Sequence, residues 1–188
     1  LHQHFQRSRI PVTNRFLKYF EIQSIKTLNA WCQVIGKGSH ESSSFFYLIK
    51  INLGINEAVY WFRDVNKWSK HSVVDQILNH NNISVLPKIL VNIIRLVKSL
   101  QDQSKKKSAG EIIWDICVQT ALLRPLTERY DYFDQLSLIN IGIFIKKAQQ
   151  FSSRKRENKG IREFNLYLET LMEIGGLPVQ YPKDNRKS

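Results

Sequence analysis

The chain has 188 residues, 43% of them hydrophobic, and its 28 Lys and Arg residues exceed its 16 Asp and Glu residues to give a formal net charge of +12. This length and composition exclude a disordered polymer and allow one domain with a substantial core. The charge favours a polyanionic partner such as nucleic acid. No apolar run approaches the roughly 20 residues that a membrane span needs, so no membrane partner is predicted.

The two cysteines, Cys32 and Cys117, both lie among apolar residues in helical patterns. A disulfide framework is therefore not expected, and no secretory signal is apparent, so we predict a cytoplasmic protein. The chain begins with Leu1 rather than methionine, inside a pattern typical of a helix. We interpret it as a fragment of a longer protein.

Helical spacing of apolar residues dominates the first half of the chain. Residues 21–35 form the clearest predicted helix, and Gly36 with Gly38 is predicted to end it. The apolar block 45–49 is also assigned to a helix, although its spacing alone does not separate a helix from a strand. Two further helices are predicted, over 56–69 and 73–80.

Local start signals define the helices of the middle of the chain. Pro87 suits the first position of a helix whose apolar stripe runs as far as Leu100. Ser108 and Glu111 have the spacing of a capping box, which predicts that another helix begins there.

Two more helices are predicted near the end of the chain. One runs to about Phe151, and the other begins near Ile161 and is closed by Gly175 and Gly176. The only extended piece is predicted at Ile10–Val12, next to Pro11. We therefore predict an all-α fold, an irregular multi-helix bundle of roughly seven to nine helices.

The sequence lacks the residue patterns of an enzyme. Residues 36–39 superficially resemble a phosphate-binding loop, but the leading glycine and the preceding strand are missing. The five histidines have no acidic companions at the spacing of a zinc site. Asp131 and Asp134 are better explained as acids at a helix start than as a catalytic pair. We predict no catalytic residue, no metal site and no cofactor in this chain.

The densest basic segment runs from Lys146 to Arg162. It is a candidate for phosphate contact, which is independent of base sequence and depends on salt. A solvated connector between two helices is an equally good interpretation. Its central candidate residues are Arg154, Lys155, Arg156 and Lys159.

A second candidate is the turn around Gly54. A glycine that opens a helix exposes backbone N–H groups without a side chain in the way, which suits a phosphate. Lys50 adds a charge, and Asn52 and Asn56 add neutral donors. An ordinary helix start is the alternative interpretation. The nearby aromatic residues are predicted to serve core and helix packing rather than to stack on bases: Tyr60, Trp61, Phe62 and Trp68.

The order of these segments resembles the inserted helical subdomain 2B of superfamily one DNA helicases related to UvrD, Rep and PcrA. Residues 1–12 resemble the family's entry from subdomain 2A, and 20–31 resemble its "F-E-x-x-E-I-K-D-L-L-A-Y" helix. Later segments resemble the family's remaining 2B helices: 42–51, 108–123, 136–151 and 161–174.

Residues 53–58 correspond to the family's "R-G-I-G" turn, which in relatives contacts duplex DNA. Gly54 and Ile55 match this motif, whereas Leu53 stands at the arginine position and Asn56 at the second glycine.

The resemblance implies three parts: 1–14 as the end of subdomain 2A and an entry segment, 15–177 as the helical 2B subdomain, and 178–188 as an exit segment or flexible tail. It implies a part that contacts duplex or junction DNA and the other helicase subdomains and regulates unwinding. ATP and Mg²⁺ would be bound by the parent enzyme alone, so this fragment would not be an enzyme. The alternatives are a stand-alone helical nucleic-acid-binding protein and a protein-interaction module.

Overall fold

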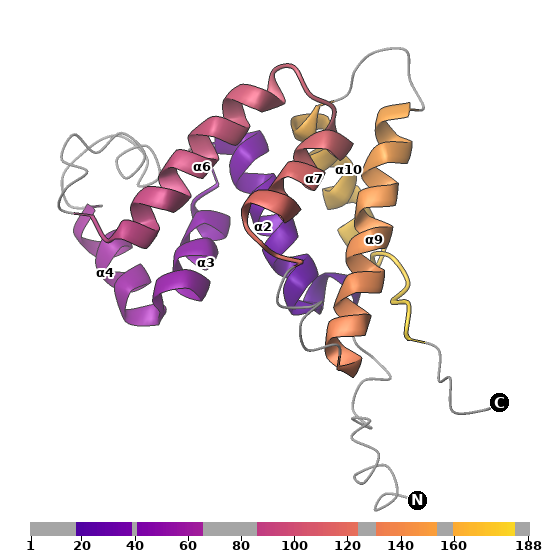
Figure 1. Ribbon diagram of the computed structural model, residues 1–188, viewed down its shortest axis with the longest axis horizontal. Coiled ribbons are helices and arrows are strands. Elements are labelled where there is room, and N and C mark those ends of the chain that lie inside the picture. Colours follow the sequence, from indigo (N-terminus) through magenta and orange to yellow (C-terminus); the bar gives the residue numbers. More distant parts are fainter. Residues whose placement is uncertain (1–17, 39–40, 66–85, 124–130, 154–159, 183–188) are drawn as a thin grey trace, which may run out of the picture.

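The computed structural model describes residues 18–38, 41–65, 86–123, 131–153 and 160–182 (Figure 1). Within these residues the chain forms seven α-helices, a 3-10 turn and no strand, which confirms the predicted all-α bundle. The elements are the 3-10 turn η2 (Tyr19–Glu21) and the helices α2 (Gln23–Lys37), α3 (Ser42–Leu53), α4 (Ile55–Val65), α6 (Lys88–Ser104), α7 (Ala109–Gln119), α9 (Tyr132–Ser153) and α10 (Ile161–Glu173).

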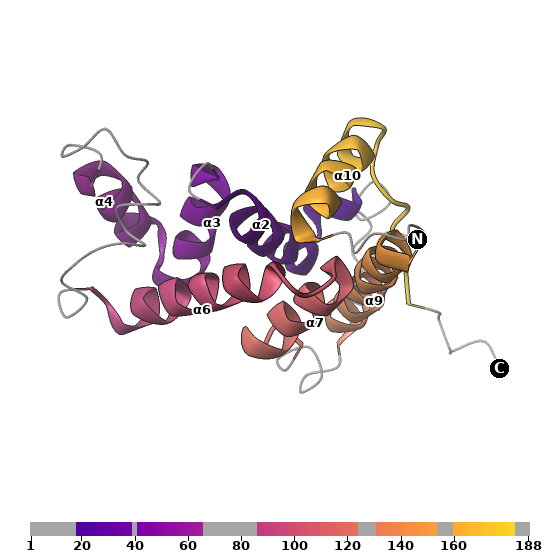
Figure 2. The same ribbon diagram turned by 90° about the horizontal axis from the view of Figure 1, so that it is seen from above.

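Helix α2 lies at the centre of the bundle and contacts η2, α3, α6, α7, α9 and α10. Helices α3 and α4 extend to one side of it, whereas α7, α9 and α10 gather on the other (Figures 1 and 2). The reason is the sequence of α2, in which both sides of the helix are apolar. Nine of its fifteen residues are buried, including Trp31 and Val34.

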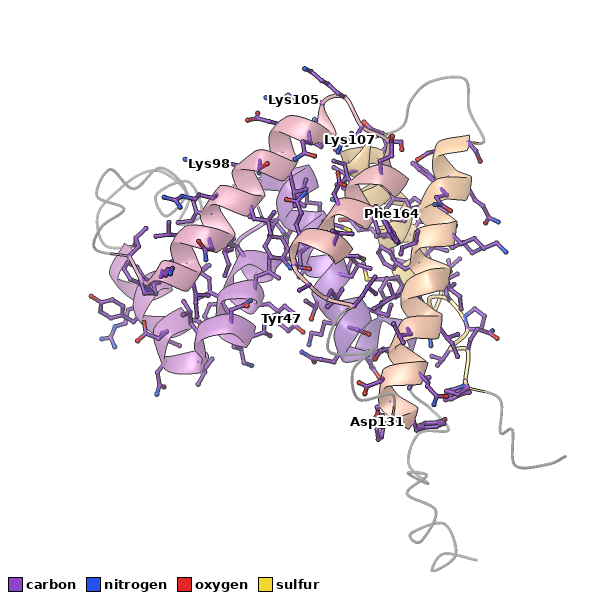
Figure 3. All side chains as sticks on the ribbon, in the orientation of Figure 1. Tyr47, Lys98, Lys105, Lys107, Asp131 and Phe164 are labelled. Carbon is purple, nitrogen blue, oxygen red and sulfur yellow. The ribbon has the colours of Figure 1, made fainter. Side chains whose placement is uncertain are left out.

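Aromatic side chains fill the space between α9 and α10. The Phe164 ring lies 5.8 Å from the Phe144 ring and 5.5 Å from the Phe151 ring, both in edge-to-face geometry. Phe164 and Phe144 are almost fully buried, and side chains of this size each stabilise the fold by roughly 1.5–3 kcal/mol through burial. Figure 3 shows Phe164 inside the bundle.

Local capping interactions begin two of the helices, as predicted. The Ser108 hydroxyl accepts a hydrogen bond from the Glu111 amide, and the Glu111 carboxylate accepts one from the Ser108 amide at 2.8 Å. At the start of α9 the Asp134 amide donates to the Asp131 carboxylate at 2.9 Å, and the Asp131 amide donates back to the Asp134 carboxylate at 3.3 Å. Asp131 and Asp134 therefore act as a helix start.

Gly36 does not end α2, contrary to the sequence prediction. It lies inside the helix, which continues to Lys37 and is capped by Gly38 at a φ of 62°. A Cβ at position 36 would lie 2.3 Å from Nδ2 of Asn165 on α10. This glycine is therefore required by the close packing of two helices, a role that the local pattern does not distinguish from a helix stop.

The beginning and the end of the described fold are held together by Asn140 of α9. The Tyr19 hydroxyl donates to the Asn140 carbonyl at 2.7 Å. The Asn140 side chain donates to the Gln180 carbonyl at 2.8 Å and accepts from the Gln180 amide at 3.1 Å. A Cβ at Gly176 would touch the Phe20 ring at 3.3 Å. The η2 region and the exit segment at Gln180 thus lie side by side.

Several predictions concern residues that the structure does not describe. They are the extended piece at Ile10–Val12, the helix over 73–80, the aromatic residue Trp68 and the five histidines.

Candidate nucleic-acid interface

The turn between α3 and α4 has the backbone that its glycine permits. Gly54 has a φ of 93°, a conformation that side-chain-bearing residues rarely adopt. Its amide donates to the Lys50 carbonyl at 2.9 Å and ends α3, and its carbonyl accepts from the Ala58 amide at 3.1 Å and begins α4. A Cβ at Gly54 would meet nothing within 4 Å. One residue therefore joins the two helices and leaves the turn open to solvent.

The first turn of α4 offers three backbone donors. In the part of the chain that the structure describes, the amides of Ile55, Asn56 and Glu57 have no hydrogen-bond partner, because Gly54 has no side chain to cap them. All three residues are exposed. Unpaired amides at a helix N-terminus attract anions, and the helix dipole adds to this attraction.

The side chains that the sequence placed at this turn contribute unequally. Lys50 is exposed and takes part in none of the ion pairs found among the described residues. The Asn52 amide group donates to the Leu48 carbonyl at 2.8 Å, so one of its two hydrogens is already used. Asn56 is exposed, and the exposed Glu57 beside it opposes an anion. The structure thus brings Lys50, Asn52, Gly54 and Asn56 to one turn with a single acid.

The second predicted site falls mostly outside the described residues. Its four central basic residues lie outside the described residues: Arg154, Lys155, Arg156 and Lys159. The described members of the basic segment are Lys146 and Lys147 on α9 and the exposed Arg162 at the start of α10.

A hollow beside Lys146 and Lys147 was not anticipated from the sequence. It has a volume of about 720 Å³ and lies between α9 and the exit segment. Its lining residues are Ile139, Ile143, Lys146, Lys147, Gln150, Gln180 and Tyr181. No local signal could have found it, because its lining combines α9 with Gln180 and Tyr181 of the exit segment, which are distant from α9 in the sequence.

The lysine cluster before α7 is largely neutralised. The Lys105 ammonium lies 2.8 Å from the Asp102 carboxylate, and the Lys107 ammonium lies 2.6 Å from the Asp115 carboxylate. Figure 3 shows Lys105 and Lys107 near the α6–α7 connection. This cluster therefore offers much less positive charge to a ligand than its sequence suggests.

Positive charge is unevenly divided along the chain. The described residues contain 14 Lys and Arg against 12 Asp and Glu, whereas the other segments contain 14 against 4. Most of the net positive charge therefore belongs to the segments outside the described helices. Within the helices, a basic surface can only arise where individual lysines lack acidic neighbours.

Apolar side chains are exposed around the α3–α4 turn. Ile51, Ile55, Val59 and Ile89 are each between 38% and 48% exposed. Ile51 and Ile89 also border a groove of about 400 Å³ between α3 and α6.

The aromatic residues of α4 divide between the core and the surface. Phe62 packs against Phe45 and Phe46, with ring centroids 6.3 and 5.1 Å away, as predicted for a core residue. Trp61 is partly buried. Tyr60 is 55% exposed and lies outside the core, but its ring packs edge-to-face against the Trp61 ring with centroids 5.3 Å apart.

The described residues offer no evident reactive group. Burial raises the pKa of the Cys117 thiol to about 11, and burial followed by the nearby Cys117 raises the pKa of Cys32. Both thiols are therefore protonated at neutral pH and shielded from substrate. No three His, Cys, Asp or Glu side chains among the described residues converge as metal ligands. None of the described helices is both long enough and apolar enough to cross a membrane.

Comparisons with known proteins identify no relative of this chain. No family model, no curated protein and no solved structure matches this chain.

Proposed function

We propose that this chain is an accessory, duplex-DNA-contacting and regulatory subdomain of an ATP-dependent DNA helicase of the UvrD, Rep and PcrA type, without the ATPase motor. ATP and Mg²⁺ would be bound by other parts of the parent enzyme. The all-α bundle is compatible with the 2B subdomain that the sequence resembles.

The observation that carries the proposal is the open turn between α3 and α4. Next to Gly54, where no Cβ covers the backbone, the turn carries three amides without a described partner, and the exposed Lys50 and Asn56 lie within four residues of this glycine. A phosphate group can accept hydrogen bonds from such amides whatever the base sequence. We infer that this turn holds the phosphate backbone of a duplex.

The adjacency of the two ends supports a role as an inserted unit. Asn140 holds Tyr19 and Gln180 close together, so the fold can be joined to a neighbouring domain at one place. A body attached in this way can swing as a unit while its core stays intact. Such a movement would couple DNA contact to regulation of the motor.

Fluorescence anisotropy with a duplex that carries a single-stranded tail tests this proposal. We expect binding to weaken steeply as salt rises, because phosphate contacts release counterions. Lys50→Glu should weaken binding and lower the slope of log affinity against log salt by about 1, the amount expected for one lost phosphate contact. Asn56→Glu should weaken DNA binding more than Lys50→Glu does, because it places an acid at the helix N-terminus.

The matched control is Lys98→Glu, which makes the same charge change on α6. Lys98 is exposed and lies away from the α3–α4 turn (Figure 3). Equal losses for Lys50→Glu and Lys98→Glu would mean a general charge effect and would contradict a site at the turn. Absence of binding at low salt would contradict DNA contact altogether.

A protein-interaction module is the second candidate. It is favoured by the exposed aliphatic side chains of Ile51, Ile55 and Val59 near the same turn, since apolar surface of this kind suits a protein partner better than a phosphate backbone. It predicts negligible DNA binding. A stand-alone nucleic-acid-binding protein would instead share the expected salt dependence.

A further inference from the structure

The hollow beside α9 has two chemically different ends. Along α9, Ile139 and Ile143 line the first part of the hollow and Lys146, Lys147 and Gln150 line the second, while Gln180 and Tyr181 of the exit segment complete the lining. The spacing follows from the helix, because positions 139, 143, 146, 147 and 150 recur on one face of α9. About 11 Å of helix axis separates Ile139 from the lysines, since seven residues rise 1.5 Å each.

Among the described residues, the basic end of the hollow has no acidic partner. No acidic residue is found among those that line it. Neither Lys146 nor Lys147 takes part in the ion pairs found among the described residues. This contrasts with Lys37, Lys105 and Lys107, each of which has an acidic partner. Two adjacent ammonium groups without partners favour an anionic ligand group.

The apolar end limits what this anionic ligand can be. Ile139 is 38% exposed and Tyr181 is 42% exposed, so apolar surface is available to a ligand. Single-stranded nucleic acid is usually held by a basic groove with several aromatic platforms for successive bases. Here the floor is aliphatic and the charge is confined to one end. A peptide with an apolar anchor and separate carboxylates matches both ends.

We infer that this hollow is a docking site for an acidic, amphipathic segment of a partner protein. Its apolar side chains lie against Ile139, Ile143 and Tyr181, and its carboxylates pair with Lys146 and Lys147. A helical ligand places these groups about two turns apart, and an extended ligand places them about three residues apart. The inference does not depend on the DNA contact at the α3–α4 turn.

The probe is a fluorescent, alanine-rich helical peptide with Leu and Phe one turn apart and two glutamates about two turns further on. The control peptide has the same composition, with the glutamates beside Leu and Phe. Binding to the whole chain is measured by anisotropy. We expect the first peptide to bind more tightly than the control, because only the first reaches both ends of the hollow.

Two double variants test the lysines. Lys146→Gln with Lys147→Gln should lower affinity for the peptide about tenfold or more, the loss expected when two charge-assisted contacts disappear. The matched control is Lys88→Gln with Lys98→Gln, which removes two exposed positive charges from α6 and should leave the affinity almost unchanged. Ile139→Gln should weaken binding of the peptide without altering the net charge of the protein. Circular dichroism checks that each variant keeps its helical content.

Three outcomes overturn the inference: equal binding of the two peptides, no effect of Lys146→Gln with Lys147→Gln, or equal effects of the two double variants. Loss of affinity for tailed duplex DNA in the α9 variant, with unchanged peptide binding, would reassign the hollow to nucleic acid. The DNA proposal is tested separately, because Lys50→Glu should weaken DNA binding and leave peptide binding intact.

Discussion

Two glycines inside helices show how differently the same residue type can act. Gly36 of α2 faces Asn165, and the Asn165 side chain donates to the Cys32 carbonyl at 2.7 Å. Gly142 of α9 faces open space, with nothing within 4 Å of a Cβ at that position. Gly36 is therefore a packing requirement, whereas Gly142 only lowers helix propensity.

Substitution of these two glycines by alanine should have opposite effects. Gly36→Ala should lower the free energy of unfolding by about 1–3 kcal/mol, because the new methyl group collides with Asn165. Gly142→Ala should raise it by roughly 0.5–1 kcal/mol through helix propensity. Urea unfolding of the two variants measures both changes. Stabilisation by Gly36→Ala would show that α2 and α10 do not approach as closely as described.

At the scale of the element, two helices begin with hydrogen bonds between residues three positions apart. The capping box of α7 uses residues three positions apart, and so does the Asp131–Asp134 pair of α9. In α7 the Ser108 side chain, and then its backbone amide, holds the pKa of the Glu111 carboxyl below its usual value. The ionised form of Glu111 is thus favoured in the folded state.

This shift predicts a pH dependence of stability. The folded pKa of Glu111 lies below the unfolded value of about 4.3, so the stabilisation is fully present above that pH and is lost as pH falls through the folded pKa. Glu111→Gln should therefore flatten the decline in stability below about pH 4.

Ser108→Ala should lower the free energy of unfolding by about 1 kcal/mol at neutral pH. It should also flatten the decline in stability at acid pH. Thermal unfolding of the wild type and both variants across pH measures these changes in stability. A decline in Glu111→Gln as steep as in wild type would exclude this carboxyl as its source.

At the scale of the whole molecule, stability should be unevenly distributed. Helix α2 is surrounded by η2, α3, α6, α7, α9 and α10, whereas α4 packs mainly against α3. Outer residues of α4 such as Val59 and Tyr60 remain exposed, and Ala58 is the one fully buried residue among those of α4 whose burial is described. The centre and the α4 edge should therefore open with different free energies.

Native-state hydrogen exchange should reveal this gradient. We expect the amides of α2 to exchange only through global unfolding and those of α4 to exchange through local opening of lower free energy. Mass spectrometry of peptides from residues 25–35 and 56–63 makes the comparison. Equal protection of the two segments would mean that α4 is an integral part of one cooperative unit.

The sequence by itself determined the features that depend on residues close together in the chain. The all-α class, the apolar face of α2 and the paired starts at Ser108–Glu111 and Asp131–Asp134 follow from spacings of three or four residues, which one turn of helix brings together. Within the described residues, the helix boundaries were predicted within a few residues for the same reason.

Only the tertiary structure decided which side chains from distant segments meet. Gly36 is needed because Asn165 packs over it, and Asn140 joins Tyr19 to Gln180. The hollow beside Lys146 exists because the exit segment lies along α9. Such contacts arise from the packing of whole helices, and a local pattern carries no information about which partner will cover each face. For the same reason, the positions where lysines lack acidic neighbours could be identified only after the chain was folded.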